Sequence, residues 1–224
     1  MKKIAILIGG LIRDYENAYP YLKENLLDKY DCDIFISTWD IKESHGTNRR
    51  NYNRIIDWSS TKKITQFEKD KLLELYNPKK IQIENFYVWE KNNKDNILNF
   101  MEKNSFTLYR KILNNIFCQW YKIFDVFKLY NTYKYDNNKI YDIVIKMRFD
   151  VIFEHIDINI ITDNKLYFLN NWGKKNNKID LIPSKLDVVE DYIFFGKEGN
   201  MKKILNIYNH ITDNKNLFND KKYL

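Results

Sequence analysis

The residues best suited to chemistry stand in the stretch YDIVIKMRFDVIF, residues 141–153. Its first half is apolar, whereas Lys146, Arg148 and Asp150 bring three charges at alternate positions. Because successive side chains of a strand point to opposite faces, these three share one face. A simple ion pair would account for Arg148 and Asp150, but charges at the end of an apolar strand are costly to desolvate unless a site uses them. The stretch therefore predicts a buried strand that ends in a ligand site.

Two further groups of small and polar residues follow strands that we expect nearer the N-terminus. They comprise Gly9, Gly10, Leu11, Arg13, Thr38 and Trp39. Ligands of open parallel sheets bind beyond the carboxyl ends of the strands, where glycine lets the backbone come close and arginine can meet a phosphate. The pattern G-x-G-x-x-G is absent, so the glycines also fit an ordinary tight turn. Trp39 either stacks on a base or fills the core.

A last group is acidic: Glu190 and Asp191 precede an apolar run that ends at Gly196. One reaction that would use such residues is the transfer of a sugar from a nucleoside diphosphate to a hydroxyl. It needs positive charge near the leaving phosphate and, if the configuration at the anomeric carbon inverts, a carboxylate base. We expect Asp150 to hold Mg²⁺ or Mn²⁺ with help from Arg148, and Asp191 rather than Glu190 to be the base. A surface acidic pair at a turn is the structural alternative for the last two.

The composition is that of one folded domain, residues 1–224, with 44% hydrophobic and 16% aromatic residues. A net charge of +7 favours anionic partners without choosing among them. Two cysteines without C-x-x-C spacing and three scattered histidines argue against a structural zinc site. The N-terminal apolar stretch is too short for a signal peptide or a membrane span, so we expect a cytoplasmic protein without a transmembrane segment.

The opening of the chain predicts a β-α-β unit. Strands are expected at Ile4–Ile8 and Asp33–Thr38, and between them a helix with Pro20 in its first turn and an apolar stripe that reaches Tyr30. Such a unit indicates an α/β fold with a mostly parallel central sheet flanked by helices.

Periodicity and capping signals predict the remaining elements. A long polar loop is expected at 39–60, followed by a helix that Thr65 and Glu68 cap and Asn77-Pro78 ends, and by a strand at Lys80–Glu84. After a polar segment at 90–104, we expect a long helix that Ser105 caps and that reaches Phe127. The last expected elements are strands at Leu166–Leu169 and Tyr192–Phe195 and a helix at Asn200–His210.

The order of several motifs resembles a group of glycosyltransferases of the GT-A type from bacterial lipopolysaccharide and capsule synthesis and from large viruses. These motifs are KIAILIGGLIRDYE, CDIFISTWD, NPKKIQIE, CQWYKIFDVFKLY, YDIVIKMRFDVIF and EDYIFFGKEGNM. The resemblance covers nearly the whole chain and implies a Rossmann-like GT-A fold, a nucleotide-sugar donor such as a UDP-sugar, a glycan acceptor and a manganese or magnesium ion. Arg148-Phe149-Asp150 resembles the DxD metal motif with Arg in place of the first Asp, and Glu190-Asp191 resembles the acidic motif that supplies the base. The nucleotide is expected against Gly9, Gly10, Leu11, Arg13, Thr38, Trp39 and Lys146.

Two other features with apparent chemistry are expected to be structural. A literal DxD at Asp31-Cys32-Asp33 precedes the second strand, at the edge opposite the expected ligand site. Cys118 lies in the long helix and is expected to be a packed thiol.

Two rival functions use the same sequence features. Arg49, Arg50 and Arg54, together with the net charge, suit a non-catalytic nucleic-acid or nucleotide-binding module, although a solvated loop explains them and no nucleic-acid partner is expected. A dinucleotide-dependent oxidoreductase would use the strand-glycine-helix opening with Asp40 as the acidic residue, but the third glycine is missing.

Overall fold

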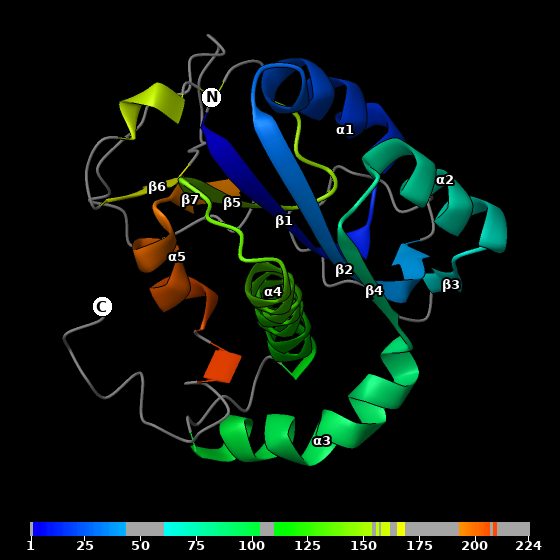
Figure 1. Ribbon diagram of the computed structural model, residues 1–224. Helices are drawn as coiled ribbons and strands as arrows, with labels where there is room; N and C mark the ends of the chain where they lie inside the picture. Colours follow the sequence, from blue (N-terminus) through cyan, green and yellow to red (C-terminus); the bar gives the residue numbers. More distant parts are fainter. Residues whose placement is uncertain are drawn as a thin grey trace, which may run out of the picture.

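The computed structural model describes residues 2–43, 61–103, 110–153, 156, 158–161, 165–168, 193–206 and 208–209 of the 224-residue chain. It shows an α/β protein in which a mixed, mostly parallel sheet forms the middle layer, with helices on both faces (Figure 1). No helix in these ranges is both long and apolar enough to cross a membrane.

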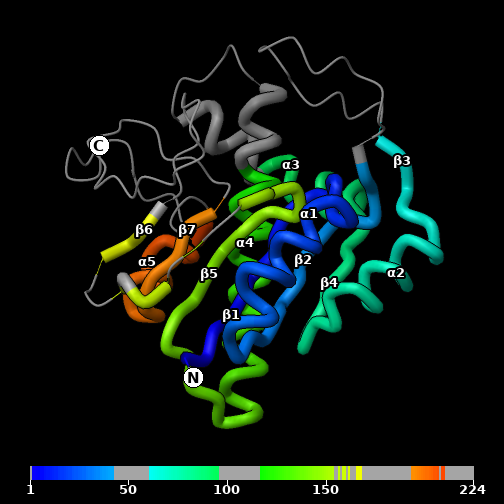
Figure 2. The backbone as a smooth tube through the Cα atoms, turned by 90° about the horizontal axis from the view of Figure 1, so that it is seen from above, coloured from blue at the N-terminus to red at the C-terminus, as the bar shows by residue number. Residues whose placement is uncertain are grey.

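The sheet has a parallel half and an antiparallel half. Its strands are β1 (Lys3–Ile12), β2 (Asp31–Glu43), β3 (Thr61–Lys63), β4 (Lys80–Glu84), β5 (Ile143–Met147), β6 (Leu166–Phe168) and β7 (Ile193–Gly196). The order is β3-β2-β1-β5-β7-β6, and β4 also pairs with β2, as Figure 2 shows. Strands β4, β2, β1 and β5 are parallel to one another, whereas β7 is antiparallel to both β5 and β6.

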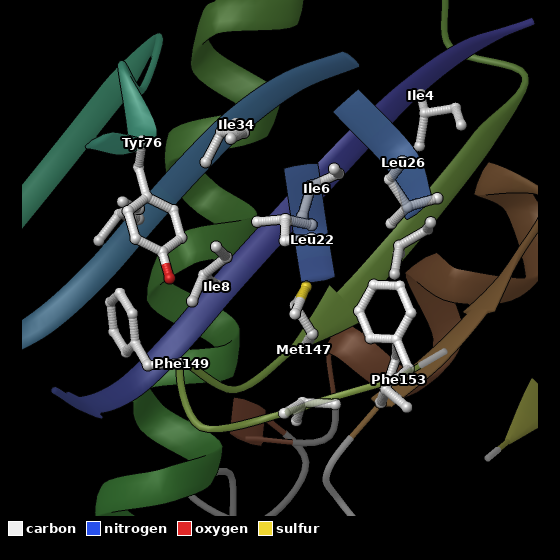
Figure 3. Packing of buried hydrophobic residues seen from close by; sticks show 14 of the residues in the cluster. Ile4, Ile6, Ile8, Leu22, Leu26, Ile34, Tyr76, Met147, Phe149 and Phe153 are labelled. Atoms are coloured by element: carbon white, nitrogen blue, oxygen red, sulfur yellow. The ribbon is translucent and has the colours of Figure 1, made fainter. Parts of the chain in front are cut away.

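The helices divide between the two faces of the sheet. They are α1 (Tyr15–Leu22), continued by a π-helix at Lys23–Leu27, α2 (Gln66–Tyr76), α3 (Phe86–Lys103), α4 (Arg110–Asp136) and α5 (Glu198–Leu205), with a short 3₁₀ helix at Ile158–Ile160. On one face, Ile4, Ile6 and Ile8 of β1 pack against Leu22 and against a cluster that includes Tyr76 and Phe149 (Figure 3). On the other face, alternate residues such as Ala5 and Leu7 pack against α4 and α5. This alternation is why both faces of the parallel strands are apolar.

Helix α4 lies unusually close to β1 at Gly9. A Cβ atom added to Gly9 would stand 2.9 Å from the carbonyl oxygen of Lys122. The glycine is therefore required by helix packing, which is a role different from the ligand approach expected for it.

Strands β1 and β2 extend further than the sequence suggested. We expected them to end at Ile8 and Thr38, but they continue to Ile12 and Glu43. Gly10 adopts a φ of +126° and the pairing shifts register between Gly10 and Ile12, so the glycine bends the strand without ending it. The first part of the expected loop is thus strand, paired with β3.

Two helices also differ from expectation. Helix α1 begins at Tyr15, so Pro20 lies inside it and not in its first turn, and a π-helical turn follows at Lys23–Leu27. The polar segment at 90–104 lies mostly within α3, whose first turn packs Phe86 and Trp89 into an aromatic cluster. Ser105, the expected cap of α4, lies outside the described residues.

Other local signals are confirmed. Glu68 donates its backbone N–H to Thr65 Oγ1 at 3.2 Å, and Thr65 donates its own N–H to Glu68 Oε2 at 2.8 Å, so the capping box opens α2. Asn77 ends that helix with a φ of +40°. The strand at Lys80–Glu84 has the expected bounds.

Candidate functional site

The candidate site lies where the direction of strand order reverses. From β1 the chain proceeds to β2 and β4 on one side, then returns to place β5 on the other side of β1. Ligands of open α/β sheets bind at such a switch point, beyond the carboxyl ends of the strands. Ile8 pairs with Met147, so Gly9 and Arg148 are the next residues of the two strands. The groups expected at Gly9 and at Arg148 therefore lie on neighbouring strands at this edge.

Arg148 and Asp150 form a bidentate ion pair just after β5. Arg148 donates from Nε to Asp150 Oδ1 at 2.9 Å and from Nη2 to Oδ2 at 2.5 Å. The two side chains are 21% and 22% exposed, so the pair borders solvent and is only partly shielded from it. Phe149, between them, is buried and packs edge-on against Tyr76, as Figure 3 shows from the side of the core. The buried ring anchors the turn and leaves the charged residues on its other side.

A side-chain hydrogen bond joins β1 and β2 beside the site. Gly10 pairs with Thr38 in the ladder, and the Thr38 hydroxyl donates to the Gly10 carbonyl oxygen at 2.8 Å. In the part of the chain that the structure describes, no atom lies within 4 Å of where a Gly10 Cβ would be. Leu11 packs against the aromatic cluster that includes Trp39 and Phe86. Arg13, which is half-buried, directly follows the end of β1. The Thr38 hydroxyl thus shapes the edge of the site from within the protein.

Trp39 belongs to the core. It is 1% exposed, lies edge-on to Phe86 at 5.3 Å between ring centroids, and stacks on Tyr121 at 5.7 Å. Of the two roles considered from the sequence, this position fits the filling of the core.

A buried charged network lies beneath the ends of β2 and β4. Lys122 of α4 is fully buried, forms an ion pair with Glu84, and stands 4.0 Å from the centre of the Trp39 ring. Asp125, 3.7 Å from Lys122, accepts a hydrogen bond of 2.7 Å from the Ser37 hydroxyl. Burial lowers the pKa of Lys122, and the ion pair with Glu84 offsets this only in part.

Sequence reasoning missed this network. The available signal was a pair of charges, Lys122 and Asp125, spaced three residues apart and flanking Ile123 on the apolar stripe of a long helix. The network ties α4 to β2 and β4, while Gly9 lets the same turn of α4 touch β1.

Lys146 is buried on the face of the sheet toward α4 and α5. It pairs with Leu7 on one side and with Phe194 on the other, and its Nζ lies 5.2 Å from the centre of the Phe194 ring. The ammonium group of Lys146 is therefore buried in the protein, two residues before Arg148.

The two features expected to be structural make contacts within the fold, and the motif Asp31-Cys32-Asp33 lies inside β2 and not before it. Asp31 and Asp33 stand at the start of β2, at the end of the sheet opposite the site; Asp31 pairs with Lys3, and Asp33 accepts a hydrogen bond from Tyr141 at 2.7 Å. Cys118 is buried in α4, where burial raises the pKa of its thiol.

The remaining expectations concern other parts of the chain. Glu190, Asp191 and the arginines at 49, 50 and 54 lie outside the described residues. Asp40 accepts hydrogen bonds from the Phe86 backbone N–H at 3.0 Å and from Asn85 at 2.9 Å. Its carboxylate thus holds the start of α3, a role that leaves the dinucleotide hypothesis without its acidic residue. Across the described ranges, no three His, Cys, Asp or Glu side chains are grouped so as to hold a metal.

Comparison of the chain with models of known protein families, with curated proteins and with solved structures finds no significant match.

Proposed function

We propose that the protein is a glycosyltransferase that moves a sugar from a nucleoside-diphosphate sugar, such as a UDP-sugar, to a hydroxyl of a glycan acceptor. The observation that carries the proposal is the Arg148–Asp150 pair, which stands at the switch point beside Gly9 and Gly10. A guanidinium at this edge suits a diphosphate, because its planar fork of N–H donors matches two phosphate oxygens.

The proposed step breaks the bond from the anomeric carbon to the diphosphate oxygen and forms a bond from that carbon to the acceptor oxygen. The electron pair of the broken bond goes to the diphosphate, whose growing negative charge Arg148 stabilises, with Arg13 and the buried charge of Lys146 adding to the positive potential. The acceptor proton goes to a carboxylate, for which we propose Asp191, with Glu190 as the alternative.

A divalent metal at Asp150 stays a prediction, and its fit to the described residues is poor. Both oxygens of Asp150 already accept hydrogen bonds from Arg148, and a metal on this carboxylate would stand close to the guanidinium. No part of the proposed step is therefore routed through a metal.

Thermal unfolding in the presence of nucleoside-diphosphate sugars, each with and without Mn²⁺, tests the proposal. A bound donor should raise Tm, by an amount equivalent to about 2.7 kcal/mol at 100 times its Kd. The shift should become clearly smaller in Arg148→Met and stay unchanged in Lys23→Met, a control that removes the exposed ion pair between Lys23 and Asp28. Steeply salt-dependent binding to DNA or RNA, with no Tm shift from any nucleotide sugar, would instead support the binding-module alternative.

A further inference from the structure

We infer that the leaving diphosphate is neutralised by the guanidinium of Arg148, held in place by Asp150, without a divalent metal. This inference rests on the proposed function and names the group that replaces a metal in it. Asp150 is then a positioning residue that acts through Arg148.

The geometry of the ion pair is the first support. Each oxygen of Asp150 accepts from a different nitrogen of Arg148, at 2.9 and 2.5 Å. Such a bidentate contact fixes the plane of the guanidinium as well as its position. A metal bound directly to the same carboxylate would lie about 2 Å from an oxygen that also accepts from a cation. The two positive groups would then compete for one carboxylate.

The permanent charge of the guanidinium is the second support. Asp150 meets the guanidinium along one edge, through Nε and Nη2. Because arginine stays protonated at every working pH, its charge needs no metal to supply it.

The anchoring of the turn is the third support. Phe149 is 1% exposed and packs against Tyr76, so the backbone between the two charged residues is held by the core. The backbone of α4 at Lys122 lies close against the neighbouring strand at Gly9. A donor group that is already oriented before the charge develops stabilises a transition state more than one that must reorient.

Calorimetric titration of a nucleoside diphosphate into the whole chain tests the inference without requiring turnover. We expect the same Kd, within about twofold, in EDTA and in Mn²⁺, and a loss of affinity of about tenfold or more in Arg148→Met, the range of a charge-assisted hydrogen bond. Arg148→Lys, which keeps the charge without the fork, should fall between them. Circular dichroism of each variant, with Lys23→Met as the control, separates lost binding from lost folding.

The role of Asp150 is tested by a double-mutant cycle. If Asp150 acts through Arg148, Asp150→Asn should weaken binding in the native background and have little further effect in Arg148→Met. Added guanidinium ion should partly restore binding in Arg148→Ala, which a merely structural ion pair would not do.

Three outcomes decide the matter. Affinity that rises more than about tenfold with Mn²⁺ and loses this rise in Asp150→Asn overturns the inference and leaves the proposed function standing. Metal-free binding through Arg148 without any transfer of sugar upholds the anion site and overturns the proposed function. No binding in either condition overturns both.

Discussion

At the scale of single residues, Gly9 illustrates a glycine required by packing. Replacement by Ala would place a Cβ 2.9 Å from the Lys122 carbonyl, and since backbone atoms of a long helix yield little, we expect a loss of about 1–3 kcal/mol in the free energy of unfolding. Gly199, in α5, has no atom of the described residues within 4 Å of the same added group, so Gly199→Ala is the matched control and should be neutral or stabilising. Urea unfolding of both variants makes the comparison. Equal stabilities would contradict the close approach of α4.

Also at the residue scale, the proposed base can be separated from the donor site. If Asp191 takes the acceptor proton, Asp191→Asn should slow single-turnover sugar transfer by about 10²-fold or more while donor affinity stays unchanged, because the donor contacts lie on other segments. Glu190→Gln is the neighbouring control. Normal turnover in Asp191→Asn would end the assignment, and a parallel loss of donor affinity would make Asp191 a binding residue.

At the scale of elements, the buried network holds α4 against the ends of β2 and β4. Lys122→Met leaves Glu84 and Asp125 without their buried cation, so we expect a loss of about 3 kcal/mol, part of which Glu84→Gln should restore in the double variant. Lys134→Met is the control, since Lys134 lies on the same helix and its pair with Glu198 is 25% and 29% exposed. Similar small losses in both single variants, measured by urea unfolding, would show that the network does not hold the helix.

The capping box of α2 predicts a pH dependence. Burial alone would raise the pKa of Glu68, but hydrogen bonds from Lys42 and Thr65 outweigh it, and the pKa falls below 4.5. A lowered pKa in the folded state means that Glu68 stabilises the fold above its unfolded pKa and loses this contribution as the pH falls through its folded pKa. Glu68→Gln should therefore lower stability at pH 7 and reduce the loss of stability on acidification.

Chemical unfolding between pH 7 and pH 3 measures both effects. Exposed Glu74 on the same helix supplies the control variant Glu74→Gln. Thr65→Ala should cost about 1 kcal/mol at neutral pH, because it removes the other half of the box. Identical pH profiles for the native chain and Glu68→Gln would contradict the assignment.

At the scale of the whole molecule, the two cysteines report on opposite faces of the sheet. Burial raises the pKa of Cys32, near α1, to about 12, and it also raises the pKa of Cys118 in α4. Because the thiolate is the reactive form, both should react with a disulfide reagent at pH 8 far more slowly than in the unfolded chain.

The variants Cys32→Ser and Cys118→Ser leave one thiol each. The reaction rate of each remaining thiol, measured at increasing urea concentration, tests whether the two faces unfold cooperatively. If residues on both faces belong to one domain, the reaction of the two thiols should accelerate over the same range of urea concentration. Two separate ranges would mean that the faces unfold independently and would contradict the single-domain prediction. Fast reaction in the absence of urea would contradict the burial itself.

The sequence by itself determined the elements whose signals are local. The β-α-β opening, the capping box at Thr65 and Glu68, the strand Lys80–Glu84 and the apolar stripe of α4 are carried by neighbouring residues, so period and capping chemistry suffice to predict them. The expectation that charged residues follow β5 was local in the same way.

Only the tertiary structure decided how these elements meet. The antiparallel pairing of β7, the extension of β2 to Glu43, the packing reason for Gly9 and the burial of Trp39 and Lys122 all depend on residues far apart in the chain. Local propensity contains no information about such partners, because a lysine on a helix is solvated or buried according to what packs against it. The contact between Arg148 and Asp150 flanks Phe149, whose ring packs against Tyr76 of a distant helix.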